Sequence, residues 1–520
     1  MRSQFRWDIP EQFNIAERCC DSWAAVAPDR VAIVHRGSDG GRTTWTYGQL
    51  KQASDGFAAR LRRRGVARGD RVAVLLAQSP EVMVAHMATY KLGAVVLPLF
   101  TLFGSDALAY RLRDSSARVV VTDRANLDKV LGLRDQLPDL AEIYCVDGAM
   151  DSVRAFWAEA DVSTDFAPVS THAEDPACLI YTSGTTGDPK GVLHAHRFLI
   201  GHLPSIETQL EGFAHPNAAG WTPADWAWIG GLMDLAIPCL YYGVTLISHR
   251  MRKFDADSAY LLMEEEQITA TFLPPTALKM MRQAKTPKNL ALRAVFSGGE
   301  SLGEELLDWG QRALGCPINE GYGQTECNLV LGSAFGSMTV KPGSMGQAEP
   351  GHDVAVIDGR GNEVPRGTLG EIAVRRGDPV MFLKYWNKPE QTAGKFVGDW
   401  MRTGDLGRQD EQGYFWYVSR DDDVITSAGY RIGPVEIENC LIGHPDVVNA
   451  AVVGVPDAER TEIVKAFVVL RPKADFERLK DSLVNRVRTR ISPHVAPRII
   501  EQIDALPMTA TGKVMRRNLR

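Results

Sequence analysis

The sequence predicts an α/β fold, and the sequence patterns of three successive segments support this prediction. Up to about residue 340, short runs that are apolar on both faces alternate with helical patterns, which is typical of a parallel sheet covered by helices. From there to about residue 420, short β-like runs are separated by Gly, Pro and Asn turns, which indicates a small barrel-like subdomain. The remaining residues have strand and helix patterns of their own, enough for a small α+β domain. We therefore expect one domain over 1–419 and a second over 420–520.

The individual elements follow from the hydrophobic period of each segment. The first 40 residues are predicted to form a docking arm, with amphipathic spacing over 13–23. Next we expect strands at 71–76, 94–100 and 118–122 and helices at 55–64, 81–92 and 106–113. Further strands are expected at 243–248, 270–274 and 292–297, with helices at 255–265, 276–283 and 302–314. The barrel-like part has runs at 353–357 and 370–374, and the C-terminal part has patterns at 450–455, 464–470 and 478–490.

Length and composition are those of an ordinary globular protein with two or more domains: 520 residues, 45% hydrophobic and 23% charged. The net charge of -6 gives no support to nucleic-acid binding. The 8 cysteines form no C-x-x-C pair, so neither a zinc site nor a disulfide framework is predicted. The N-terminus lacks the apolar stretch of a signal peptide, and the longest apolar run, 94–103, is too short to span a bilayer. We expect a cytoplasmic enzyme without stable membrane insertion.

A loop rich in Ser, Thr and Gly follows the apolar run 177–180. It reads Tyr181-Thr-Ser-Gly-Thr-Thr-Gly-Asp-Pro-Lys-Gly191. Backbone N–H groups, hydroxyls and the cation of Lys190 can together hold a polyphosphate. The loop is not a Walker A motif, because Lys190 is followed by a glycine and not by a hydroxyl residue.

Further motifs follow this loop along the chain. They are Ser297-Gly-Gly-Glu-Ser301, Glu320-Gly-Tyr-Gly-Gln-Thr-Glu326, Met401-Arg-Thr-Gly-Asp-Leu406, Ser419-Arg-Asp-Asp-Asp-Val-Ile-Thr-Ser-Ala-Gly-Tyr-Arg431 and Leu506-Pro-Met-Thr-Ala-Thr-Gly-Lys-Val-Met-Arg516. In this order the motifs resemble those of the adenylate-forming superfamily, which contains acyl-CoA synthetases, luciferases and the adenylation domains of peptide synthetases. The resemblance covers roughly residues 25–520, and the 320–326 string looks most like the medium-chain acyl-CoA synthetases.

The resemblance implies an AMP-forming acid–thiol ligase that uses ATP, Mg²⁺ and CoA. The superfamily has two parallel-type, helix-covered sheets and a small β-barrel in its large domain, followed by a small mobile C-terminal domain. Its catalytic lysine corresponds to Lys513, and its phosphate loop corresponds to Thr182, Ser183, Gly184, Thr185, Thr186, Gly187 and Lys190. Thr185 and Glu326 are also expected to act in catalysis, with Glu326 as the Mg²⁺ ligand.

The remaining nucleotide contacts are carried over from the same resemblance. Tyr322 corresponds to the residue that stacks on adenine, and Asp405 to the acid that accepts bonds from the ribose hydroxyls. Arg420 and Arg431 correspond to arginines on the phosphate side, a task that suits planar guanidinium groups. Arg488 corresponds to an arginine that meets the CoA phosphates. The other expected binding residues are Gly299, Glu300, Ser301, Glu320, Gly321, Gly323, Gln324 and Thr325.

The hinge of the C-terminal domain is assigned to Asp422. The three consecutive aspartates blur the register, so Asp421 remains the alternative. The family usually has glycine before the arginine at 420, whereas this chain has Ser419.

The acyl pocket is expected around Trp228, Ile229, Gly230, Gly298 and Gly323. In acetate-activating relatives a tryptophan stands where this chain has Gly323. The glycines remove side-chain volume, so the resemblance implies an acid larger than acetate: medium-chain or branched aliphatic, or a small aromatic acid such as benzoate. Each buried methylene contributes only about 0.8 kcal/mol, which favours a broad substrate profile.

Three other functions are compatible with these motifs. One is a ligase that loads a carrier protein, although a fused carrier domain is absent; another is a benzoate-type aryl-CoA ligase. The third is a nucleotide-binding regulator without catalysis, against which Lys513 and Glu326 argue. A homodimer is compatible with the sequence.

Overall fold

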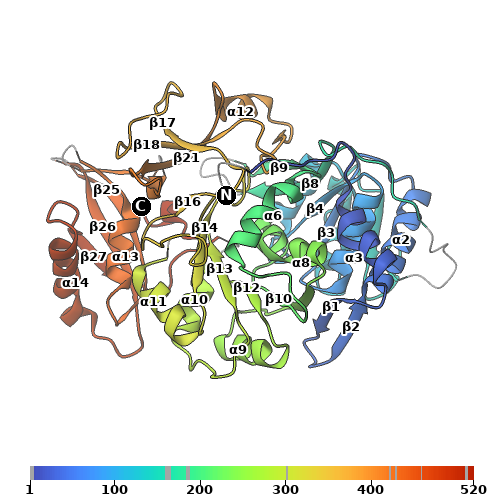
Figure 1. Ribbon diagram of the computed structural model, residues 1–520, viewed down its shortest axis with the longest axis horizontal. Helices are drawn as coiled ribbons and strands as arrows, with labels where there is room; N and C mark the ends of the chain where they lie inside the picture. The colour runs from blue at the N-terminus through green and yellow to red at the C-terminus, as the bar shows by residue number, and fades with distance from the viewer. Residues whose placement is uncertain are drawn as a thin grey trace.

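The computed structural model describes residues 5–157, 166–182, 188–299, 302–420, 423–427, 430–457, 460–509 and 513–520, without the side chains of Thr426, Tyr430 and Arg431. Over these residues the strands form four sheets (Figure 1). Two large sheets lie in the centre and on the right of this view, an antiparallel sheet lies above them, and the C-terminal strands lie on the left. The α/β fold with parallel sheets and a C-terminal domain is confirmed.

The first large sheet has the strand order β19-β9-β8-β4-β3-β5-β6-β7. From β8 to β7 each strand is parallel to its neighbour, whereas β9 and β19 join antiparallel. The strands are β3 Arg71–Leu75, β4 Val95–Pro98, β5 Ala117–Thr122, β6 Glu142–Cys145, β7 Arg154–Ala155, β8 Pro176–Thr182, β9 Lys190–Ala195 and β19 Lys384–Tyr385.

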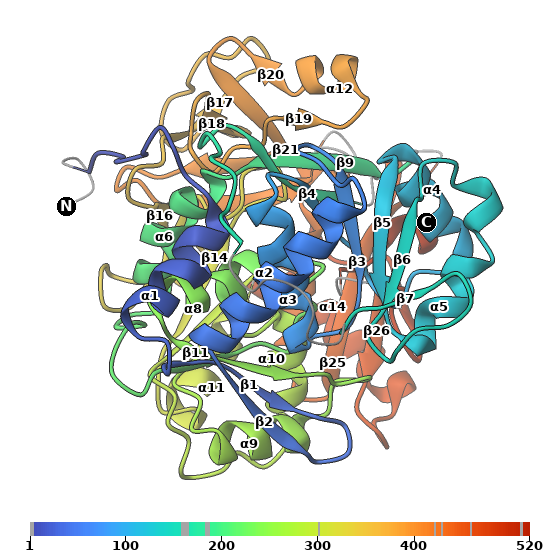
Figure 2. The same cartoon turned by 90° about the vertical axis from the view of Figure 1, so that its right-hand side faces the viewer.

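Alternate residues of β3 show why this sheet is parallel and buried. Val72 and Val74 belong to one apolar cluster, whereas Ala73 and Leu75 belong to another on the opposite face. Successive side chains of a strand point to opposite faces, so a run that is apolar at every position needs cover on both. Helices α4 Ser105–Asp114 and α5 Arg124–Leu131 cover the outer face, at the right of Figure 2.

The second large sheet has the order β16-β15-β14-β13-β12-β10-β11-β1-β2 and is parallel from β14 to β1. Helices α9 Ala256–Glu265, α10 Pro275–Met281 and α11 Glu304–Ala313 cover its outer face. Its strands are β1 Val31–Arg36, β2 Arg42–Thr46, β10 Ala219–Trp221, β11 Thr245–His249, β12 Ala270–Phe272, β13 Ala294–Gly298, β14 Ile318–Tyr322, β15 Leu331–Ser333 and β16 Gln347–Ala348.

The largest apolar cluster joins the two sheets. It combines residues of β3 and β8 with residues of β1, β11 and β13, and with helices that lie between them (Figure 2). These helices are α2 Tyr47–Arg63, α3 Pro80–Lys91, α6 Phe198–Gln209 and α8 Ile237–Tyr242. The two sheets and their helices therefore share one apolar core.

Where the sequence predicts a small barrel, β17 Val354–Ile357, β18 Gly370–Arg375, β21 Trp400–Gln409, β20 Phe396–Val397 and β22 Phe415–Arg420 form a five-stranded antiparallel sheet. Helix α12 Pro389–Gly394 lies beside it (Figure 1).

The C-terminal sheet consists of β23 Ile425–Ser427, β24 Tyr430–Ile432, β25 Val447–Asp457, β26 Thr461–Leu470 and β27 Ile499–Gln502. Helices α13 Pro434–Ile442 and α14 Phe476–Arg490 share an apolar cluster with it. Polar contacts between the described residues of this domain and the large one include Lys279 Nζ, 3.2 Å from Asn449 Oδ1, and Arg486, 3.5 Å from Glu305 of α11.

Two expectations about the elements are wrong. The first 40 residues are not only a docking arm, because 31–36 form β1, which pairs with both β11 and β2 inside the second sheet. Helix α2 begins at Tyr47, well before residue 55, because Thr46 and Gln49 form a capping box. Over the described residues, no helix has the length and apolar character needed to cross a membrane.

Candidate active site

The candidate site lies where β13 and β14 end. The two strands are parallel neighbours, with Gly298 opposite Gly321, so their carboxyl ends meet at one edge of the sheet. Ligands of open α/β sheets bind in the crevice beyond this edge. The chain leaves β13 through Gly299, whose φ of +96° is readily adopted only by glycine.

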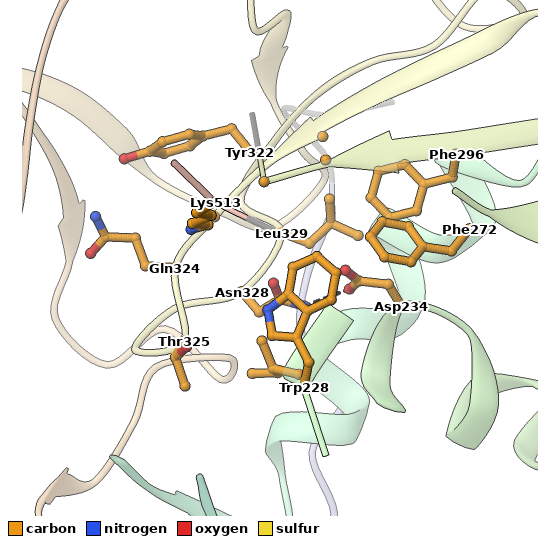
Figure 3. A pocket seen from close by; sticks show the side chains of 15 residues that line it. Trp228, Asp234, Phe272, Phe296, Tyr322, Gln324, Thr325, Asn328, Leu329 and Lys513 are labelled. Carbon is orange, nitrogen blue, oxygen red and sulfur yellow. Dashed lines mark hydrogen bonds between the residues drawn. The ribbon is translucent and has the colours of Figure 1, made fainter. Parts of the chain in front are cut away.

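A pocket at this edge brings together residues from motifs far apart in the chain. The predicted residues that line it are Trp228, Ile229, Gly298, Gly299, Gly321, Tyr322, Gly323, Gln324, Thr325 and Lys513. Figure 3 shows Lys513 and Gln324 on one side and Phe272, Phe296 and Asp234 on the other. Gly230 is adjacent, since a Cβ built on it would lie 3.0 Å from the Trp228 ring.

Lys513 reaches the pocket from the C-terminal tail. Two hydrogen bonds join Thr509 to Lys513. The Thr509 N–H donates to the Lys513 carbonyl at 2.7 Å, and the Thr509 hydroxyl accepts from the Lys513 N–H at 3.0 Å. Beyond Lys513, Arg516 donates to Glu438 of α13 and to Asp423. The lysine is thus tied to the body of the C-terminal domain. Lys513 remains an exposed residue, and its side chain lines the pocket at the end of β13.

Asp405 is the centre of a polar cluster beside the pocket. It lies in β21 opposite Arg420 of β22, and it is only 4% exposed. Its carboxylate accepts hydrogen bonds from the Tyr322 hydroxyl and from the Gln324 amide, both at 2.6 Å, and forms an ion pair with Arg420 at 3.4 Å. The sequence-predicted residues Tyr322, Gln324, Asp405 and Arg420 are therefore in direct contact.

Glu326 and Lys190 meet at Tyr385, a residue that the sequence analysis missed. The Tyr385 hydroxyl donates to a Glu326 carboxyl oxygen, and Lys190 Nζ lies 5.2 Å from the centre of the Tyr385 ring. Tyr385 is in β19, which pairs with β9 immediately after Lys190. Burial, reinforced by the Glu326 carboxylate, raises the pKa of Tyr385, so its hydroxyl remains a donor. No local pattern could have indicated this pairing.

Glu320 lies in β14 with its carboxyl group buried. It accepts a hydrogen bond from the Leu302 N–H at 3.0 Å, and burial raises its pKa to about 8. At pH 7 the side chain is therefore mostly a neutral acid that can donate as well as accept.

Several predicted residues lie outside the described part of the chain: Ser183, Gly184, Thr185, Thr186, Gly187, Glu300, Ser301, Asp421 and Asp422. Thr182 is half-buried at the end of β8, where it pairs with Lys190. Arg431 is in β24, and Arg488 is exposed on α14 and does not line the pocket.

The sequence analysis expects Gly298 and Gly323 to enlarge the pocket by removing side-chain volume, and the structure contradicts this reason. A Cβ built on Gly323 would lie 2.1 Å from the Leu329 nitrogen, and one on Gly298 would lie 2.7 Å from the Gly321 carbonyl oxygen. The space beside these glycines is filled by backbone, so they permit close chain packing and do not by themselves enlarge the pocket. The walls come from Trp228, Phe272 and Phe296 instead.

Gly323→Ala is consequently expected to destabilise the fold by about 1–3 kcal/mol and to lower activity with every acid, because the added methyl group displaces the backbone of 328–329. Urea unfolding and kcat/KM with short and long acids measure both effects. Gly394→Ala is the control, since a Cβ there meets nothing within 4 Å. An unchanged stability with a selective gain for acetate would show that the glycine does open the pocket.

Comparison with known proteins agrees with this arrangement. The family model described as AMP-binding enzyme matches residues 20–386, and the model of the AMP-binding enzyme C-terminal domain matches 436–513. The acetyl-coenzyme A synthetase of Bacillus subtilis (strain 168) is 35% identical over 489 residues, which are 92% of this chain and 84% of that protein. The mitochondrial acyl-coenzyme A synthetase ACSM3 of Mus musculus is 33% identical over 540 residues, covering 100% of this chain and 92% of that protein.

A solved structure extends the similarity to the fold. The anthranilate CoA ligase AuaEII in complex with anthranoyl-AMP superposes with a TM-score of 0.91 at 28% identity, covering 98% of this chain and 97% of that one. The chain therefore belongs to the AMP-binding enzymes of the adenylate-forming superfamily and is an AMP-forming acyl- or aryl-CoA ligase.

Proposed function

We propose that this enzyme activates a carboxylic acid larger than acetate, a medium-chain or branched aliphatic acid or a small aromatic acid, as an acyl-adenylate and transfers the acyl group to CoA. The supporting observation is that Lys513, Gln324 and Thr325 line the same pocket as the apolar rings of Trp228, Phe272 and Phe296. A cation and polar groups for the carboxylate thus adjoin an apolar space for the acyl group.

In the first step the substrate carboxylate attacks the α-phosphorus of ATP, and pyrophosphate leaves. Lys513 would neutralise charge between the carboxylate and the α-phosphate, while Lys190 and the loop 182–187 would hold the other phosphates. The Asp405 cluster, with Arg420 and Arg431, would position the ribose and phosphates. Tyr322, Gly299, Glu300, Ser301 and Glu320 would surround the adenine.

Glu326 fits the role of the magnesium ligand. One of its carboxyl oxygens accepts from Tyr385, whereas the other has no partner among the described residues. Mg²⁺ is commonly held by one or two carboxylates together with substrate phosphates, and the described residues contain no cluster of three or more metal-binding side chains. When bound with ATP, Mg²⁺ would neutralise charge on the triphosphate.

We infer that the second step needs a rearrangement, because Lys513 lines the pocket in which the acyl-adenylate would lie. A rotation of the C-terminal domain about Asp422 would withdraw Lys513, bring residues 428–430 to the site and place Arg488 near the CoA phosphates. The CoA thiol would then attack the acyl-adenylate and release AMP.

Asp422→Pro tests this hinge. Proline restricts φ and would block the rotation while leaving the adenylate-forming arrangement intact. We expect carboxylate-dependent exchange of pyrophosphate into ATP at the rate of the unchanged enzyme, with thioester formation lost. An equal loss of both steps would contradict the hinge assignment. Asp421→Pro tests whether the hinge lies at Asp421, the alternative position, instead.

An aryl-CoA ligase is the second candidate, and the aromatic walls favour it. The Phe272 ring centre lies 5.5 Å from that of Trp228 and 5.1 Å from that of Phe296, so the three rings contact one another and present one aromatic surface to the acyl group. AuaEII, the structural neighbour, acts on an aromatic acid by its title.

The acid panel that separates these candidates is acetate, butyrate, octanoate, 2-methylbutyrate and benzoate, with CoA thioester measured for each. We expect kcat/KM for acetate to be the lowest, since acetate leaves the aromatic walls uncovered. Acetate as the best substrate would contradict the proposal and would match the name of the Bacillus subtilis relative.

A further inference from the structure

One carboxyl group stands in the otherwise apolar wall of the pocket. Asp234 belongs to the π-helical turn Leu232–Ala236, between α7 Ile229–Gly231 and α8, and its sequence neighbours are fully buried apolar residues. Asp234 itself is 5% exposed and lines the pocket. π-Helical turns occur often at functional sites, and the resemblance assigned no role to this residue.

A hydrogen-bond chain fixes Asp234 in place. The Asn328 amide nitrogen lies 2.5 Å from Asp234 Oδ1 and 3.0 Å from His202 Nε2. His202 Nδ1 lies 2.5 Å from the Phe198 carbonyl oxygen, so Nδ1 carries the proton and Nε2 accepts. Burial lowers the pKa of His202 to about 4, which agrees with a neutral ring. Both hydrogens of the Asn328 amide are therefore used, and the orientation of Asp234 is set by its surroundings.

The second carboxyl oxygen of Asp234 has no partner among the described residues. Only Oδ1 receives a hydrogen bond, from Asn328. An apolar ligand that covers this oxygen leaves it without a hydrogen bond, which is costly, and a ligand that supplies the bond avoids that cost. The wall therefore favours ligands with a polar group at this point.

The position of Asp234 in the pocket indicates which end of the acyl group would contact this residue. Figure 3 shows it beside Phe272 and Phe296, across the pocket from Lys513 and Gln324. With its carboxylate near Lys513, an acid would direct its remote end toward Asp234.

We propose that Asp234 determines specificity and that the preferred substrates are carboxylic acids with a hydroxyl or amino group at the end remote from the carboxylate. This inference rests on the proposed CoA-ligase function and narrows its substrate class. The second Asp234 oxygen forms a hydrogen bond with the substrate group, while Trp228 and Phe272 enclose the apolar part between.

The protonation state of Asp234 favours a hydroxyl group over an amino group at the remote end of the substrate. Burial raises the pKa of this carboxyl group well above its ordinary range, so the acid is neutral in the empty pocket. Oδ1 accepts from Asn328, which leaves the proton to the other oxygen. The oxygen of a substrate hydroxyl group can accept the hydrogen bond that this O–H donates, whereas a methyl group cannot.

The test uses the full chain with ATP, Mg²⁺ and CoA, and acids matched in size. The pairs are 3-hydroxybenzoate with 3-methylbenzoate, 4-hydroxybenzoate with 4-methylbenzoate, and 6-hydroxyhexanoate with heptanoate. In at least one pair we expect kcat/KM to be about tenfold or more higher for the hydroxy acid, since a site with a buried hydrogen-bonding group rejects analogues that lack the partner. This ratio is independent of the fraction of active enzyme.

Two variants then assign the preference to Asp234. In Asp234→Leu, and in Asp234→Leu combined with Asn328→Leu, we expect the ratio to fall to about one or to reverse. The double variant removes both partners and so leaves no buried amide unsatisfied. Asp378→Asn is the control, because this buried acid binds His352 outside the pocket. In this variant the ratio of kcat/KM for the hydroxy acid to kcat/KM for its matched acid should equal that of the unchanged enzyme.

Three results would overturn the inference. A ratio within twofold of one in every pair, or a preference that survives both variants, would remove the role of Asp234 while leaving the ligase function in place. If none of these acids and none of the simple acids of the panel gives a thioester, the proposed function fails, and this inference fails with it.

Discussion

Replacing Lys513 with alanine is expected to lower the rate of acyl-adenylate formation by about 10²–10³-fold. The lysine is the cation that the C-terminal tail brings into the pocket, and removing one group that stabilises developing charge typically costs this much. The loss should appear in carboxylate-dependent exchange of pyrophosphate into ATP. Thioester formation from supplied acyl-adenylate and CoA should be nearly unchanged, because that step needs the lysine withdrawn.

Lys480→Ala is the matched control for this variant. Lys480 is a lysine on α14 of the same domain, and it pairs at the surface with Glu477. Its loss should leave both steps as they are. An equal loss of the two steps in Lys513→Ala would mean that the lysine serves the fold or the domain interface and not the first step.

The second large effect is expected at Asp405. Asp405→Ala leaves the Tyr322 hydroxyl without its acceptor and leaves the Gln324 amide with only the Thr403 carbonyl, and hydrogen bonds to a charged group contribute roughly 1.5–3 kcal/mol each. We expect the free energy of unfolding to fall by about 2–4 kcal/mol. We also expect the KM for ATP to rise by about 100-fold, which corresponds to about 2.7 kcal/mol and so to one such bond.

Urea unfolding and ATP titrations measure the two effects separately. Asp399→Ala is the control, because this carboxylate lies next to β21 and its side chain is 82% exposed. Asp405→Asn keeps an acceptor oxygen and should fall between the two. If Asp405→Ala changed stability without changing the KM for ATP, Asp405 would be a structural residue only.

The parallel sheets could be predicted because strands such as β3 have several apolar residues in succession. Val72 to Leu75 face two cores in turn, and only a strand covered on both sides accounts for that pattern. The start of α2 was missed although Thr46 and Gln49 had the spacing of a capping box, because the apolar period begins later.

The motif residues of the site could be predicted from the resemblance, but its walls could not. Phe272 and Phe296 lie in strands, where an aromatic residue looks like any core position. Tyr385 reaches Glu326 only through the pairing of β19 with β9, which has no local signal. Asp234 did leave a signal: it is an acid within the apolar run 232–237, and such a residue needs either a partner or a role.

The most direct test of the account is the stoichiometry of one reaction: ATP, Mg²⁺, CoA and a single acid, with pyrophosphate, AMP and CoA thioester all measured. The account predicts that the three products form in equal amounts, only when the acid is present, and more readily with butyrate, octanoate or benzoate than with acetate. Pyrophosphate and AMP without consumption of CoA would contradict it and would indicate another acceptor, such as a carrier protein. No acid-dependent pyrophosphate at all would indicate a nucleotide-binding protein without this catalysis.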